Sequence, residues 1–103
     1  MRENAELKLQ AKLAQLYQGY QDARQEVHSM QTDVLPVLQE ANRETRRAFE
    51  YGRYGYLELQ AAQTDLLSAQ QALLDAAVRA QYLRIAIERL IATDLGALRG
   101  ENK

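Results

Sequence analysis

The chain has 103 residues, a length that accommodates at most one domain, and a net charge of -1 with acidic and basic residues intermixed. This balance gives no basic field for a nucleic acid and no acidic tail. The absence of cysteine excludes disulfides, thiolate nucleophiles and thiolate metal sites. Charges interrupt every apolar run, so no transmembrane helix is expected, and the first ten residues lack the apolar core of a secretion signal.

The first half of the chain is predicted to form one long helix over residues 3–51. Its apolar residues recur at alternating intervals of three and four, the spacing of a coiled-coil seam. Pro36 lies inside this helix and lacks a backbone N–H, so we expect a bend near it. The predicted first seam comprises Leu9, Leu13, Leu16, Tyr20, Ala23, Val27, Met30, Val34, Val37, Ala41, Glu44, Ala48 and Tyr51.

A turn is predicted at residues 52–55. Gly52 directly follows the last seam residue, where a left-handed C-terminal cap is favourable. Gly55 stands three residues before Glu58, the spacing of a capping box in which the glutamate side chain reaches back to the N-cap N–H. The two glycines therefore indicate that the chain reverses direction here.

Tyrosines crowd this turn although a turn does not require them. Tyr51, as a seam residue, is expected to cover the end of the seam. For Tyr54 and Tyr56 two interpretations are open. The two side chains cover the helix ends, or they form a contact surface, where aromatic residues with polar tips are enriched.

A second helix is predicted over residues 56–95, followed by a tail at 96–103. Its seam alternates large leucines with small alanines, which lets two helix axes approach closely. The whole chain is therefore predicted to be all-α, a long antiparallel two-helix coiled-coil hairpin forming a single unit over residues 1–103. The second seam comprises Leu59, Ala62, Leu66, Ala69, Leu73, Ala76, Ala80, Leu83, Ile87 and Leu90.

The second helix carries another apolar stripe, roughly opposite its seam: Leu67, Leu74, Val78 and Ile85. A two-helix hairpin buries one face of each helix and would leave these residues in water. Scattered surface apolar residues are common. The regular spacing favours the alternative, in which the stripe contacts a neighbouring hairpin and the chain self-associates.

The stretch "FEYGRYGYLELQAAQTDLLSAQQALLDA" resembles part of the TolC family of outer-membrane efflux channels, which has a turn glycine, an aromatic residue and an "AQ..L..A" helix. The resemblance is nearest to the CzcC-type subgroup of heavy-metal cation exporters. "VLPVLQEANRETRRAFEYG" is similar to the preceding helix of that family, and "YLRIAIERLIATDLG" to its closing segment. The likeness is strongest from Val34 to Gly96.

The resemblance implies that this chain is one periplasmic tunnel hairpin, from the second repeat of a trimeric outer-membrane channel subunit, and that it is an excised segment. It implies neighbouring hairpins that contact the stripe of Leu67, Leu74, Val78 and Ile85. It also implies a periplasmic adaptor at the tip, through which an inner-membrane pump supplies energy. Heavy-metal cations are the implied cargo, and no cofactor is implied. The implied adaptor-docking residues are Gly52, Arg53, Tyr54, Gly55 and Tyr56.

Two departures from the family pattern matter. Gly55 stands where the family usually has serine or threonine, and Ala61 stands where it usually has aspartate. In some members that aspartate lines the constriction of the tunnel mouth. Alanine at this position argues against a charged gate here.

No catalytic or metal site is expected. His28 is the only histidine, and Glu26 lies two residues from it, which on a helix puts the two side chains on different faces. A catalytic triad would have to use this one histidine, so we expect no enzyme. Two other readings of the hairpin stay open: the hairpin of an adaptor protein, although the adaptor-type tip is absent, and a free-standing scaffold that forms a four-helix bundle.

Overall fold

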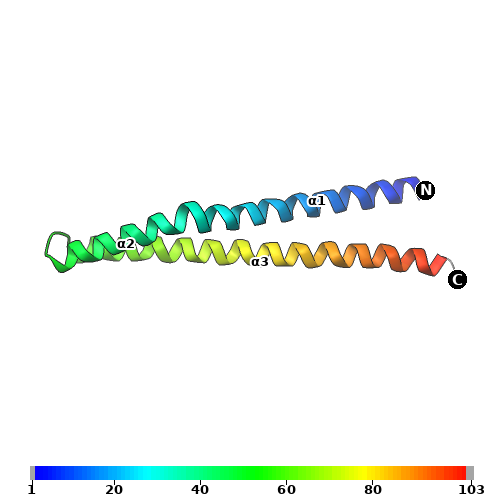
Figure 1. The fold of residues 1–103 in the computed structure, drawn as a ribbon. Coiled ribbons are helices and arrows are strands. Elements are labelled where there is room, and N and C mark those ends of the chain that lie inside the picture. Colours follow the sequence, from blue (N-terminus) through cyan, green and yellow to red (C-terminus); the bar gives the residue numbers. More distant parts are fainter. Residues whose placement is uncertain (1, 102–103) are drawn as a thin grey trace. The chain divides into compact units, whose positions relative to one another are not determined.

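A computed structural model describes residues 2–101 of the chain, and the side chains of residues 3–96. The predicted all-α helical hairpin is confirmed, with no strand anywhere in residues 2–101 (Figure 1). The second helix continues beyond residue 95, where a tail was expected, as far as Glu101. In chain order the elements are helix α1 (Arg2–Ser29), the π-helix η1 (Met30–Val34), helix α2 (Leu35–Glu50) and helix α3 (Tyr56–Glu101).

The helices are organised in two compact units. The turn unit, Gln25–Ala76, contains the end of α1, η1, α2, the connecting turn and the first part of α3. In Figure 1 the turn is the green loop between α2 and α3, and it reverses the direction of the chain. The terminal unit combines residues 2–24 of α1 with residues 77–101 of α3. Each unit therefore consists of helical segments from the two halves of the chain.

The seam of α3 has the burial that its sequence pattern predicts. Leu59, Ala69 and Ala76 are buried, and the other predicted seam positions of α3 are half-buried. Ala23, in α1, is fully buried as well. Small side chains at the most protected positions allow close packing of helices, while the half-buried leucines and isoleucine fill the spaces beside them. The half-buried residues of the two predicted seams are Leu9, Leu13, Leu16, Tyr20, Val27, Met30, Val34, Ala48, Ala62, Leu66, Leu73, Ala80, Leu83, Ile87 and Leu90.

Gly19 marks a close contact inside the terminal unit. A Cβ atom added at this glycine would lie 3.3 Å from Cδ1 of Leu83 and 3.8 Å from its Cδ2. The first distance is tighter than ordinary van der Waals contact. Glycine in the middle of a helix costs about 1 kcal/mol relative to alanine, and here it makes room for the leucine side chain of α3.

The predicted seam is wrong at three positions of α2, whereas the next predicted position, Ala48, is half-buried. Val37, Ala41 and Glu44 are exposed, with Val37 at 65%. The half-buried residues in their place are Leu38, Asn42 and Thr45, each one position further along the chain. The reason is η1, because a π-helical turn contains about one more residue than an α-helical turn and shifts the phase of the first turns of α2 by one position.

Pro36 accounts for the position of the π-helix. It lies in the first turn of α2, and in a regular helix its ring would clash with the carbonyl of Thr32 and leave that carbonyl without a donor. In the π-helix the N–H of Leu35 donates instead to the carbonyl of Met30, five residues back. Thr32 Oγ1 also donates to the carbonyl of His28 at 2.8 Å, a side-chain bond that often bends helices. The expected local distortion thus takes the form of a widened turn directly before Pro36.

Candidate functional site at the helical turn

The turn between α2 and α3 closes with a Schellman motif. Gly52 has a φ of +74°, the left-handed conformation that its place after the helix predicts. The N–H of Arg53 donates to the carbonyl of Ala48 at 2.8 Å, and the N–H of Gly52 donates to the carbonyl of Phe49 at 3.0 Å. These two bonds satisfy carbonyls that the end of α2 would otherwise leave without donors. The backbone of the turn is therefore fixed by hydrogen bonds, and its side chains are left available.

Gly55 begins α3 as its N-cap. The carbonyl of Gly55 accepts the first helical hydrogen bond, from the N–H of Leu59 at 3.4 Å. The Glu58 side chain folds back over the glycine, because a Cβ added at Gly55 would lie 2.9 Å from Glu58 Oε2. This placement agrees with the predicted capping box. A larger residue at position 55 requires only that the flexible end of Glu58 moves aside.

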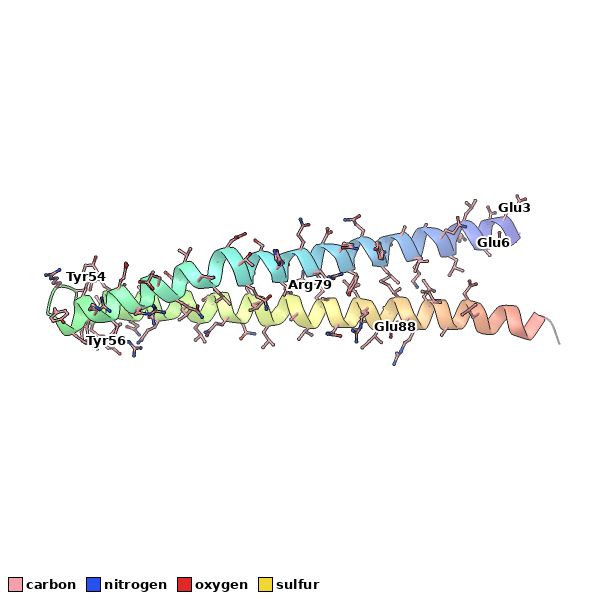
Figure 2. All side chains as sticks on the ribbon, in the orientation of Figure 1. Glu3, Glu6, Tyr54, Tyr56, Arg79 and Glu88 are labelled. Atoms are coloured by element: carbon pink, nitrogen blue, oxygen red, sulfur yellow. The ribbon has the colours of Figure 1, made fainter. Side chains whose placement is uncertain are left out.

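The tyrosines of the turn are exposed to solvent. Tyr54 is 52% exposed and Tyr56 is 65% exposed, and both lie where the turn unit reverses direction (Figure 2). Tyr51 was expected to cover the end of the seam, and this is wrong: it is 76% exposed. Tyr51 follows Glu50, the last residue of α2, and its backbone has left the helical conformation. Three tyrosine rings therefore lie in water around one tight turn.

A shallow hollow lies beside the turn on α2. It is lined by Glu44, Arg47, Ala48, Tyr51 and Arg53. An aromatic ring flanked by charges of both signs is suited to a polypeptide surface. Sequence reasoning missed this hollow because it assigned Glu44 and Tyr51 to the seam. The signal that was available is Pro36, whose effect on the helix changes which residues of α2 face outward.

The second apolar stripe of α3, called here the α3 stripe, is exposed at all four of its residues, Leu67, Leu74, Val78 and Ile85. Leu67 and Leu74 belong to the turn unit, and Val78 and Ile85 belong to the terminal unit. The stripe lies on the outward face of each unit, since the seam positions of the same helix are buried or half-buried. Such regularly spaced exposed leucines and branched residues are typical of surfaces that contact other proteins.

Two ion pairs lie on the surface of the helices. Arg43 Nη1 lies 2.9 Å from Glu40 Oε2, and Arg84 Nε lies 3.8 Å from Glu88 Oε1, with all four side chains largely in solvent. Each such pair contributes about 0–1 kcal/mol to stability. His28 is exposed. Within the described part of the chain, no group of three histidine, cysteine, aspartate or glutamate residues is placed to hold a metal ion.

No helix in the described residues combines the length and apolar character required to cross a bilayer. Comparison of the chain with protein-family models, with curated proteins and with solved structures finds no match. The candidate site is therefore defined by its own geometry: a hydrogen-bonded turn that presents Arg53, Tyr54 and Tyr56, and an exposed apolar stripe on α3.

Proposed function

We propose that this chain is a tunnel-forming periplasmic hairpin of an outer-membrane efflux channel of the TolC type, and that its turn docks a periplasmic adaptor protein. Heavy-metal cations are the proposed cargo, and a trimer is the proposed assembly of the complete subunit. The observation that carries the proposal is the turn itself. A hairpin tip needs glycine and a helix cap, but it does not need three exposed tyrosines.

Two further features support the proposal. The first is the sequence resemblance, which places "FEYGRYGYLELQ" at the tip and a leucine-rich helix after it. The second is the α3 stripe, because a helix in a tunnel wall contacts neighbours on both sides, whereas an isolated hairpin leaves one face in water. The proposal does not rest on a match to a family model. It rests on these residues and on their exposure.

The tip is tested by Tyr54→Ala and Arg53→Glu in a complete channel subunit that carries this hairpin. Both side chains are exposed and only the backbone of Arg53 takes part in the Schellman motif, so helicity should stay at the parent level. Loss of an interface contact of about 1–2 kcal/mol lowers affinity roughly tenfold. We therefore expect weaker cross-linking to the adaptor at the tip and lower resistance to the exported metal.

The control for this pair is Gly55→Ser. Serine is a good N-cap and displaces only the flexible end of Glu58, so folding and cross-linking should both be retained. Full adaptor cross-linking and full resistance in both Tyr54→Ala and Arg53→Glu would show that the aromatic turn is no docking surface.

The α3 stripe is tested in the isolated chain by sedimentation. The double variant Leu67→Glu/Leu74→Glu places two charges on the proposed contact face and should shift the chain toward the monomer, since buried unpaired charges oppose association. The matched control is Ala61→Glu/Ser68→Glu, which adds the same charge at the same seven-residue interval on other exposed positions of α3. A parent chain that stays monomeric at high concentration would argue against the stripe as an interface.

A free-standing helical scaffold is the second candidate, and the same stripe favours it, because a four-helix bundle would also cover these residues. The tip separates the two candidates. A scaffold predicts that Tyr54→Ala and Arg53→Glu have no effect on any partner, whereas a channel hairpin predicts a loss of adaptor docking with unchanged self-association.

A further inference from the structure

The exposed side of α2 carries a row of residues with seam spacing. This α2 row consists of Val37, Ala41, Glu44 and Tyr51, and all four are exposed; Ala48, which lies between Glu44 and Tyr51 in the same phase, is half-buried. Counted with Ala48, these positions continue, at intervals of three and four, the phase of Val27, Met30 and Val34, which are half-buried in the same unit. If residues 30–34 were α-helical, the α2 row would lie on the side that faces α3.

The side of α2 that is packed in the structure is less apolar than the α2 row. From Leu38 onward its half-buried members are Leu38, Asn42, Thr45 and Ala48, and two of the four are polar. Asn42 Oδ1 is shielded from solvent and has no hydrogen-bond partner among the described residues. An unpaired buried acceptor disfavours this packing, because the group has lost its bonds to water without replacement.

The two packings bury different side chains of α2. The α-helical arrangement would bury Val37 and Ala41 and return Asn42 and Thr45 to water. It would also bring Glu44 to the seam, where a long side chain can still extend its carboxylate to solvent. Against it stands Pro36, whose ring and missing N–H are accommodated by the π-helix. Burial of apolar side chains favours the α-helical arrangement, and Pro36 favours the π-helix. Because the two arrangements differ by a rotation of one residue, both packings are accessible.

We propose that α2 packs on α3 in two registers and that η1 switches between them. In the π register, Leu38, Asn42 and Thr45 face α3 and the α2 row is in water. In the α register, residues 30–34 are α-helical, α3 covers Val37 and Ala41, and Asn42 and Thr45 are in water. The widened turn thus controls whether an apolar row beside the tip is exposed. The switch goes beyond the proposed function and does not depend on what docks at the turn.

The chain has no cysteine, so single cysteines report on the register directly. Val37→Cys and Leu38→Cys are made separately, and the rate of alkylation by a maleimide is measured for each. In the otherwise unchanged chain, position 37 should react faster than position 38, because Val37 is 65% exposed and Leu38 is half-buried. In the Pro36→Ala background the order should reverse, because alanine removes the reason for the π-helix. Alanine also favours the helix, so folding is retained.

Deletion of Gln31 is the matched control. It removes the extra residue from the π-helical turn, so that a regular helix brings Leu38, Asn42 and Thr45 to the seam. Combined with Pro36→Ala, the deletion should restore faster alkylation at position 37. An unchanged order in Pro36→Ala alone, at parent helicity by circular dichroism, would overturn the switch. A reversed order that persists in the deletion variant would overturn it as well.

Discussion

Replacing Gly52 with valine is expected to lower the free energy of unfolding by about 1–2 kcal/mol, the cost of holding a residue with a Cβ in the left-handed region. The φ of Gly52 is +74°, and an added Cβ would meet no atom within 4 Å outside its chain neighbours. The expected loss therefore comes from backbone strain, in a residue whose N–H also closes the Schellman motif. Urea unfolding followed by circular dichroism measures it.

Gly96→Ala is the control for this prediction. An added Cβ at Gly96 also meets no atom within 4 Å, but Gly96 lies within α3. Alanine there should raise stability by up to about 1 kcal/mol through helix propensity. Substitution of these two glycines, whose surroundings are equally open, should therefore change the free energy of unfolding in opposite directions. A Gly52→Val chain that unfolds at the same urea concentration as the parent would mean that the turn accepts another backbone conformation.

The second large effect is expected at the contact between Gly19 and Leu83. Gly19→Leu introduces a side chain where even a Cβ lies 3.3 Å from Leu83 Cδ1, and overpacking of this kind costs about 1–3 kcal/mol. Leu83→Ala, at a half-buried position, should cost about 2 kcal/mol, the low end for such truncations. The double variant exchanges the small and the large residue of this contact. We expect it to lose less free energy of unfolding than the two single variants lose together.

The double-mutant cycle, measured by urea unfolding of all four chains, gives the coupling between the two positions. Additive losses would show that Gly19 does not make room for Leu83. Helix propensity cannot explain a loss of stability in Gly19→Leu, because leucine is a better helix former than glycine. Any destabilisation by Gly19→Leu must therefore come from the packing.

The fold could be predicted from the sequence because its determinants are local and repeated. The seam of α3 repeats every three and four residues without interruption, and each repeat indicates the same face. Gly52 is a single residue, but only one common helix ending requires glycine after the last turn. These two signals were sufficient to place the helices and the turn.

The packing of α2 could not be predicted in the same way. Heptad reasoning selects the most apolar row, which is Val37, Ala41 and Tyr51, and it assumes a constant number of residues per turn. Pro36 indicates a distortion but does not specify a bend, a break or a widened turn. Only the last of these rotates the helix by one position and brings Asn42 to the seam. The errors at Val37, Ala41 and Glu44 follow from this one assumption.

The alanine-lined seams have a thermodynamic consequence. In the described part of the chain, the buried side chains are Leu59, Ala23, Ala69 and Ala76, and no large side chain is fully buried. The heat-capacity increment of unfolding grows with the apolar area newly exposed to water, by about 0.45 cal/K/mol per Å². A hairpin with this little apolar burial has a small increment for its length. Its stability curve is correspondingly flat, so that cooling and moderate warming change the free energy of unfolding little.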